Sequence, residues 1–288
     1  MVYFISNTIS KNMNKLHKTP TDISNLNKEG QFCIYNRESK KNILFLGSCR
    51  HSPSMFYYSL LNPDINIFCI YVPFWSSNNL VSLPIKTINN ILKSTDIIIT
   101  ETIRNHGVLN TDRQEKNNFF ETFDCNHMSE IRVPNLHLAV YLYDVVQLCK
   151  KNRSNYKQTF DESMARLKRS IYSKGFDDLY DFIIKYFADI RMFYTFNHPS
   201  TIVSMLVFKI LMRQLGQQDL IDSNFFHRVK DYNFLGGHGT PITNTDISTY
   251  NFNFNTKVFD DSIVNSPGFL HVLETKELII SDKYLDLI

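Results

Sequence analysis

The stretch Asn42–His51 contains the residues whose types and spacing are best suited to chemistry. Its apolar run ends at Gly47, which is typical of a short buried strand followed by a tight turn. Pro53 suits the first turn of a helix, with Ser52 as the N-cap. Backbone N–H groups at such a helix start stabilise a thiolate, an oxyanion or a phosphate. Cys49 is therefore a candidate nucleophile, although a small buried residue in a βα turn would give the same pattern.

His198 is the residue that we expect to activate Cys49. A cysteine nucleophile needs a neighbouring base or a positive field that lowers its pKa, and histidine is the usual partner. Of the nine histidines, His198 is the most suggestive because Phe196–Ser200 reads Phe-Asn-His-Pro-Ser and opens a new helix after a long helical segment. A histidine that only caps this helix would fit the same pattern.

Further polar residues follow the strand expected at 43–46 and a later strand expected at 96–100. His51 is a candidate for contact with a ligand, and Arg50 is either a phosphate or carboxylate ligand or a solvated side chain. Glu101 follows a second buried strand and is suited to orienting a histidine or a substrate hydroxyl. Arg104 and Asn105 fall on the same rim by topology. Neither a GxGxxG fingerprint nor a P-loop occurs in the chain.

The first hundred residues predict a parallel α/β sheet. Apolar runs at 31–35, 43–46, 65–72 and 96–100 are expected strands, and helices are expected at 53–61 and 84–92. A β-α-β-α-β order with continuous apolar strands indicates a parallel sheet covered on both faces. Ligands bind at the carboxyl ends of strands in such sheets, so the segments after Leu46 and Ile99 should be neighbours.

The rest of the chain is expected to be rich in helices. Residues 1–30 are a polar N-terminal arm, and residues 31–288 are predicted to form a single α/β domain with a helical region from about 137 to 215. Polar residues 103–130 are predicted to be a long excursion over the site. The expected later elements are a strand at 131–134, a helix at 137–149, a helical pattern over 160–192, a helix at 201–215, a turn at 236–239 and a final helix after Pro267.

The composition favours a globular protein that does not bind nucleic acid. Hydrophobic residues make up 43% of the chain and charged residues 20%, which is ordinary for a soluble domain. The formal net charge of +3 is too small for a nucleic-acid footprint, and the basic residues form no long run. No apolar stretch approaches the roughly 20 residues of a membrane span.

The cysteines indicate a reducing compartment. There are five of them, at positions 33, 49, 69, 125 and 149, widely spaced and without a CxxC pair. This pattern argues against a disulfide framework and against a zinc site. The start of the chain also lacks the layout of a secretory signal. A cytoplasmic location is therefore expected, in a host cell if the source is viral.

Four stretches occur in the order seen in the WcbI family of polysaccharide-biosynthesis proteins, and the chain resembles that family over residues 42–215. They are Ile43–Arg50, Thr100–Thr102, Ile131–His137 and Phe196–Ser200. The family usually has Gly-Asn-Cys-Gln where this chain has Gly-Ser-Cys-Arg, and it usually has Gln where Glu101 stands. Because the family is similar in layout to SGNH/GDSL hydrolases, the resemblance implies an SGNH-like three-layer α/β fold.

The resemblance also implies an activity, namely transfer of an acetyl group from acetyl-coenzyme A to a sugar hydroxyl or amine. The acceptor would be a sugar or a sugar nucleotide, and no metal is implied. The residues implied as catalytic are Cys49, His198 and Glu101. Those implied as contacts of coenzyme A are Gly47, Ser48, Arg50, His51, Arg104 and Asn105.

The mechanism and two other functions stay open at this stage. Either Cys49 attacks the thioester with help from His198, or His198 deprotonates the acceptor while Cys49 and backbone N–H groups of the turn stabilise the oxyanion. An SGNH-like glycan esterase, with Cys49 where such enzymes place serine, would fit the same residues. A non-catalytic structural protein that retains the fold is the third alternative.

Overall fold

The protein was analysed as a computed structural model that describes residues 33–34, 41–48, 50–71, 89–90, 92–101 and 127–288. The chain divides into two compact units, Met1–Val133 and Pro134–Ile288. The expected arm at 1–30 and the excursion at 103–130, apart from its last residues, lie outside the described residues, as does most of the helix expected at 84–92.

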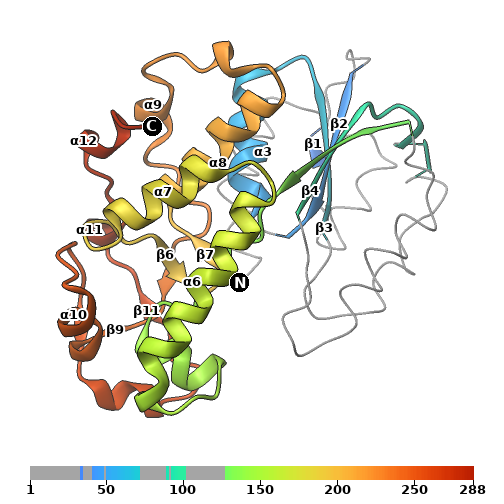
Figure 1. Ribbon diagram of the computed structural model, residues 1–288. Coiled ribbons are helices and arrows are strands. Elements are labelled where there is room, and N and C mark those ends of the chain that lie inside the picture. The colour runs from blue at the N-terminus through green and yellow to red at the C-terminus, as the bar shows by residue number, and fades with distance from the viewer. Residues whose placement is uncertain (1–32, 35–40, 49, 72–88, 91, 102–126) are drawn as a thin grey trace. The chain divides into compact units, whose positions relative to one another are not determined.

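The first unit is built on a five-stranded sheet in the order β1-β3-β2-β4-β5 (Figure 1). Four strands run parallel, and β1 pairs antiparallel with β3 at one edge. The strands are β1 (Cys33–Ile34), β2 (Asn42–Gly47), β3 (Asn66–Tyr71), β4 (Ile97–Glu101) and β5 (Ser129–Val133). The parallel α/β prediction and the strands expected from the apolar runs are thus confirmed.

The central strand β2 is buried along its whole length and is flanked by β3 and β4. Leu44 lies opposite Phe68 of β3 and Ile98 of β4, so apolar side chains of the three strands share one register. Helix α3 (His51–Leu61) follows β2 and packs against it. A strand that is buried on both faces has a continuous apolar sequence, as β2 does.

Helix α3 begins two residues earlier than the sequence predicts. Ser52 was expected as the N-cap and Pro53 as the first helical residue, whereas the N-cap is Arg50 and the helix starts at His51. The backbone N–H of His51 donates to the oxygen of Ser48 at 3.1 Å, which closes the turn directly onto the helix. The turn between β2 and α3 is therefore very short.

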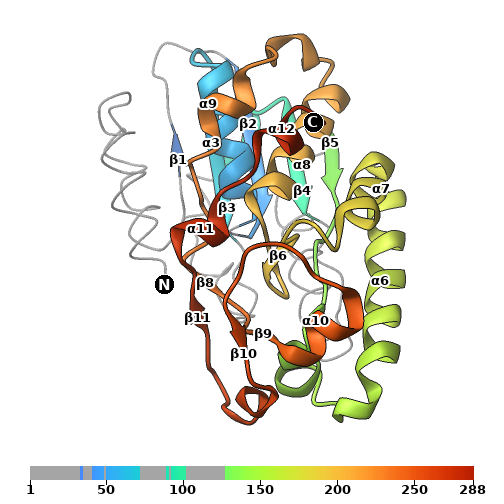
Figure 2. The ribbon, with the colours of Figure 1, turned by 90° about the vertical axis from the view of Figure 1, so that its left-hand side faces the viewer.

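The second unit is dominated by helices (Figure 2). Its longer helices are α6 (Tyr156–Tyr172), α7 (Asp177–Tyr186) and α8 (Thr201–Gln214), and the shorter ones are α9 (Phe225–Val229), α10 (Asn244–Tyr250), α11 (Thr275–Leu278) and α12 (Asp282–Leu285). A π-helix at Asp144–Leu148 and 3-10 helices at Arg153–Asn155, Gln218–Leu220 and Asp261–Asn265 complete the helical elements. The expected helix-rich C-terminal half is confirmed.

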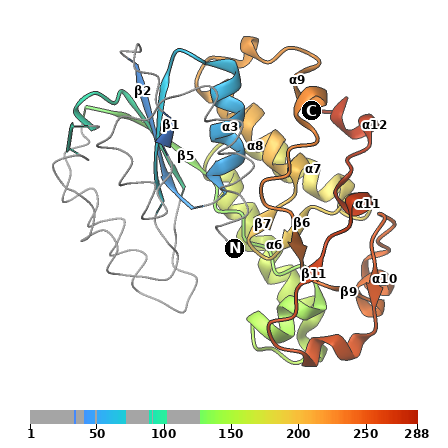
Figure 3. The ribbon, with the colours of Figure 1, turned by 180° about the vertical axis from the view of Figure 1, so that it is seen from behind.

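Short strands pair within the second unit. They are β6 (Phe193–Thr195) with β7 (His198–Pro199), β8 (His238–Gly239) with β11 (His271–Val272), and β9 (Ile242–Thr243) with β10 (Val258–Phe259). The turn expected at 236–239 thus contains strand β8. Figure 3 shows α9 beside α12, where Lys230 pairs with Asp282 at 2.7 Å.

The segment 160–192, for which the sequence predicts a helical pattern, contains two separate helices, α6 and α7. α6 ends near Gly175, whose φ of 71° lies in the left-handed region that favours glycine. The N–H of Phe176 donates to the oxygen of Ile171 at 3.2 Å, which closes the end of the helix. α7 then starts with Asp177 and Asp178, acids that suit a helix N-terminus. The helix expected at 201–215 is confirmed as α8.

The helix expected at His137–Cys149 is wrong over its first half. Backbone donors there bond to distant partners instead of the carbonyl four residues earlier. Leu138 donates to the oxygen of Phe196 at 2.8 Å, and Ala139 donates to Ser163 Oγ at 3.0 Å. Leu142 donates to Asp246 Oδ1 at 2.8 Å. Tertiary hydrogen bonds therefore override the local helical pattern. No helix among the described residues is long and apolar enough to cross a membrane.

Candidate active site

The candidate site of the first unit lies at the carboxyl end of β2, where the chain turns into α3. Strand β4 ends beside it, because Leu46 of β2 is in register with Thr100 of β4. This register brings the turn after Gly47 next to Glu101, the last residue of β4. The sequence-based expectation that the two strand ends meet at one place is confirmed.

Glu101 is buried and contacts the turn through both carboxylate oxygens. Its Oε2 accepts hydrogen bonds from the backbone N–H of Ser48 at 3.1 Å and from Ser48 Oγ at 2.6 Å. Its Oε1 forms an ion pair with the guanidinium of Arg50. Arg50 Nε also donates to Ser48 Oγ at 3.0 Å. Ser48, Arg50 and Glu101 therefore form one closed network.

His51 lies in the same turn with its ring buried. The ring packs edge-on against Phe45 with centroids 5.5 Å apart, and Nε2 lies 3.3 Å from the backbone oxygen of Leu46. Burial lowers the pKa of His51, and the Glu101 carboxylate and the Leu46 hydrogen bond oppose this only in part. His51 is thus neutral at physiological pH and contributes no positive charge to the turn.

Glycine is required at position 47 because the side chains of His51 and Glu101 lie very close to its backbone. A Cβ at this position would lie 2.4 Å from His51 Nε2 and 2.9 Å from the Cβ of Glu101. The absence of a side chain at Gly47 is therefore what lets the histidine and the glutamate close over the end of β2.

Three residues depart from the pattern of the WcbI family that the chain resembles, namely Ser48, Arg50 and Glu101, and they contact one another. Arg50 and Glu101 stand where that family usually has Gln, and here they form a buried ion pair. Sequence reasoning treated the two residues separately. Three other predicted site residues, Cys49, Arg104 and Asn105, lie outside the described residues.

His198 belongs to the second unit, in the hairpin of β6 and β7 that precedes α8. It is in register with Thr195, and its side chain is half-buried. Pro199 follows it, and Ser200 is the N-cap of α8. The hairpin fixes the backbone of His198 at the start of an almost fully buried helix.

His137 is a histidine that sequence reasoning did not propose as a site residue, although it lies in the quoted Ile131–His137 stretch. Its ring contacts that of Phe196 edge-on, with centroids 5.6 Å apart. The neighbouring Leu138 donates to the oxygen of Phe196 at 2.8 Å. His137 therefore lies against the same hairpin as His198. The stretch Ile131–His137 was the sequence feature that could have identified it.

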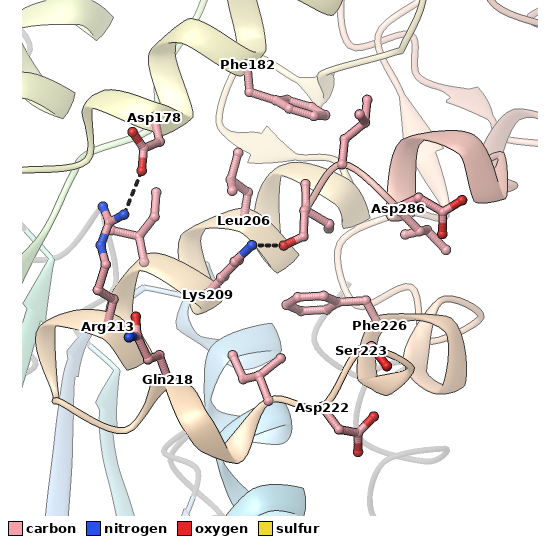
Figure 4. A pocket seen from close by; sticks show the side chains of 15 residues that line it. Asp178, Phe182, Leu206, Lys209, Arg213, Gln218, Asp222, Ser223, Phe226 and Asp286 are labelled. Carbon is pink, nitrogen blue, oxygen red and sulfur yellow. Dashed lines mark hydrogen bonds and ion pairs between the residues drawn. The ribbon is translucent and has the colours of Figure 1, made fainter.

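A cavity of about 610 Å³ in the second unit is a separate feature (Figure 4). The 15 residues that line it include neither histidine nor cysteine. Its two cations are engaged, because Arg213 pairs with Asp178 at 2.7 Å and Lys209 donates to the backbone oxygen of Ile288. Its lining thus offers no cysteine nucleophile and no histidine base. Across the described part of the chain, no three His, Cys, Asp or Glu side chains are grouped as a metal site.

Comparison with solved structures shows a similarity to WcbI. That protein is described as a polysaccharide biosynthesis enzyme, in a native form without a disulfide bond between coenzyme A and one of its cysteines. The TM-score is 0.50 at 13% sequence identity, and the match covers 76% of this chain and 82% of WcbI. The similarity shows a shared fold. No family model and no curated protein sequence matches the chain.

Proposed function

We propose that the protein is an acetyltransferase of glycan biosynthesis that moves an acetyl group from acetyl-coenzyme A to a sugar hydroxyl or amine. The observation that carries the proposal is the β2–α3 turn, where Glu101 holds the residues on both sides of Cys49. The fold shared with WcbI, a polysaccharide biosynthesis enzyme, supports the glycan substrate class.

The turn offers the chemistry that acyl transfer needs. α3 has no acidic residue in its first turn, so no side chain of the helix itself offsets the positive end of its dipole. An oxyanion formed at a thioester carbonyl is stabilised by N–H donors when they are held in place beforehand. Ser48 and Arg50 are held in place by Glu101.

Two routes follow for the residues of this chain. In the first, Cys49 Sγ forms the new bond to the acetyl carbon, and His198 takes the thiol proton and passes it to the departing thiolate. The acceptor hydroxyl then attacks the acetyl carbon, the bond to Cys49 Sγ breaks, and the acceptor proton passes through His198 to the released Cys49 thiolate. In the second, His198 takes the acceptor proton as the hydroxyl attacks the thioester carbon, and the turn N–H groups and Cys49 stabilise the oxyanion. The bond to the coenzyme A sulfur then breaks, and His198 gives the proton to the departing thiolate. Acetyl-coenzyme A supplies an activated acetyl thioester in both routes.

The described residues fit the thioester end of coenzyme A better than its phosphates. Gly47 and Ser48 would place backbone close to the thioester of coenzyme A. Neutral His51 adds no charge to the turn. Arg50 is engaged by Glu101 and Ser48, so a phosphate would have to break a buried ion pair to reach it. We propose that Arg104 and Asn105, which lie outside the described residues, also contact coenzyme A.

Intact-mass spectrometry after incubation with acetyl-coenzyme A tests the proposal. The first route predicts that the wild type gains one acetyl group and that Cys49→Ala does not. The second predicts no adduct, but release of free coenzyme A that requires a sugar acceptor and is lost in His198→Gln. Cys149→Ala is the matched control and should behave as the wild type, because this half-buried thiol is not one of the proposed site residues.

Two results would overturn the proposal. One is a folded wild type that shows neither adduct nor acceptor-dependent release of coenzyme A with hexose and amino-sugar acceptors. The other is Cys49-dependent cleavage of acetylated sugars without any use of acetyl-coenzyme A, which would identify an esterase instead.

A further inference from the structure

The cavity of about 610 Å³ in the second unit has a wall made partly by a short segment that follows α11. Four consecutive residues of this segment, Leu285 to Ile288, line the cavity. Three apolar side chains line it from longer-range neighbours, namely Phe182 of α7, Leu206 of α8 and Phe226 of α9 (Figure 4). The segment therefore covers apolar surface that three other helices supply.

Residues 282–288, which contain α12 and are called the flap below, form a self-contained piece of backbone. The N–H of Tyr284 donates to the oxygen of Ser281 at 2.9 Å, and the N–H of Ile288 donates to that of Leu285 at 3.2 Å. In the described part of the chain, no hydrogen bond between main-chain groups joins the flap to residues before Ser281. Leu285 and Ile288 are its only buried side chains. The flap can thus move away without breaking the backbone hydrogen bonds of other elements.

Polar side chains of α8 and of the α9 region hold the flap over the cavity. The pairs are Lys230 with Asp282 at 2.7 Å, His227 Nε2 with Asp286 Oδ1 at 3.0 Å, and Lys209 with the backbone oxygen of Ile288. The Asp282 and Asp286 side chains are 61% and 67% exposed. Exposed pairs of this kind are individually weak and are screened by salt. Apart from the burial of Leu285 and Ile288 and a ring contact of Tyr284 with Tyr186, weak contacts therefore hold the flap.

The chain just before the flap has a fixed point followed by an extended link. Glu277 of α11 is fully buried, accepts from Thr256 Oγ1 at 2.6 Å and lies 2.7 Å from His271 Nε2. Ile279 and Ser281 then have extended backbone, and Ile279 is 69% exposed. A few residues at the ends of elements are enough to absorb a hinge motion. Residues 279–281 have the position and exposure that such a hinge needs.

We propose that residues 282–288 are a hinged flap that opens and closes this cavity while the rest of the second unit stays folded. Opening gives solutes access to the apolar side chains of Phe182, Leu206 and Phe226. Segments with few buried contacts open locally at a lower free energy than global unfolding requires. The flap lies outside the residues of the proposed function and controls access to a separate site.

The test is iodoacetamide labelling of two full-length variants, Leu285→Cys and Val229→Cys, with the labelled site identified by peptide mass spectrometry. Both native side chains are 3% exposed, but Val229 belongs to α9 and not to the flap. A buried thiol reacts only while its surroundings are open, so the rate reports the open population. Leu285→Cys should react at least about tenfold faster than Val229→Cys. Urea should accelerate it less, because flap opening exposes less surface than unfolding.

Two further substitutions, each made in the Leu285→Cys protein, test what holds the flap. Lys230 pairs with Asp282 of the flap, whereas Arg228 pairs with Asp222 outside it at 2.6 Å. Lys230→Met should accelerate labelling roughly threefold, as for the loss of one exposed ion pair, and the matched control Arg228→Met should leave the rate unchanged. Raising the salt concentration to about 1 M should accelerate labelling too, and less so in Lys230→Met.

A segment that opens only with its whole unit would give a different result. Leu285→Cys and Val229→Cys would then react at the same rate and with the same urea dependence, and that outcome would overturn the flap. Equal acceleration by Lys230→Met and Arg228→Met would overturn it as well. If Leu285→Cys does not fold, Ile288→Cys replaces it, because Ile288 is the other buried residue of the flap. Labelling needs neither coenzyme A nor a sugar, so failure of the proposed function would leave this result standing.

Discussion

Asp144 lies in an environment that differs strongly from that of an ordinary surface acid. It is almost fully buried at the start of the π-helix, and its Oδ1 accepts a hydrogen bond from Thr240 Oγ1 at 2.9 Å. No described residue bonds to its Oδ2. Burial raises the pKa of Asp144 to about 7, the Asp246 carboxylate adds to this effect, and Thr240 and Arg191 oppose it.

The pH dependence of the free energy of unfolding should reveal the titration of Asp144. Between about pH 4 and pH 7 the folded protein holds a proton on Asp144 that the unfolded chain has lost, so the free energy of unfolding falls as the pH rises. Asp144→Asn keeps the acceptor for Thr240 and removes the titration. The variant should therefore gain stability relative to the wild type as the pH rises, by about 4 kcal/mol at most, and the gain should level off above pH 7.

Urea unfolding of both proteins from pH 4 to pH 8 measures this difference. Asp246, whose pKa burial also raises, is present in both proteins, and because its carboxylate acts on Asp144 the difference reports Asp144 together with its coupling to Asp246. A stability difference that stays constant across the range would show that Asp144 does not take up a proton on folding.

At the scale of elements, the β2–α3 junction could be predicted because its signals are local. An apolar run, Gly47 and Pro53 are read directly from neighbouring residues. The helix start was misplaced by two residues because His51 enters the helix through a backbone bond to Ser48. The helix expected at 137–149 failed for the opposite reason, since distant partners such as Asp246 take its backbone donors.

The junction should be intolerant of a side chain at Gly47. In Gly47→Ala the new methyl group would lie 2.4 Å from His51 Nε2 and 2.9 Å from Glu101 Cβ, so the ring or the strand must shift. We expect a loss of about 1–3 kcal/mol in the free energy of unfolding, as for other overpacked sites. Chemical unfolding at fixed pH provides the measurement.

Gly237→Ala is the control for this substitution. A Cβ at Gly237 meets nothing within 4 Å, and its φ lies outside the left-handed region, so a change within about 0.5 kcal/mol is expected. Equal stabilities of the two variants would show that the approach of His51 and Glu101 to Gly47 is not a tight one.

At the scale of the whole molecule, the sequence predicted the fold class and the meeting of two strand ends, and it missed the contacts that join distant residues. The rule for parallel sheets placed Glu101 near Ser48, but the pairing of Glu101 with Arg50 needed side-chain geometry. The bond between Asp144 and Thr240 spans 96 positions, and no motif or period links the two residues. Such contacts depend on the packing of the second unit.

The measurement that tests the central claim most directly is thermal unfolding with and without coenzyme A and acetyl-coenzyme A, on the wild type and on Cys49→Ala, with ATP as the control phosphate ligand. A ligand that binds only the folded state at 100 times its dissociation constant adds about 2.7 kcal/mol. The account predicts a higher melting temperature with both coenzyme A species in both proteins and no comparable rise with ATP. No rise at millimolar coenzyme A in a folded protein, or an equal rise with ATP, would contradict it.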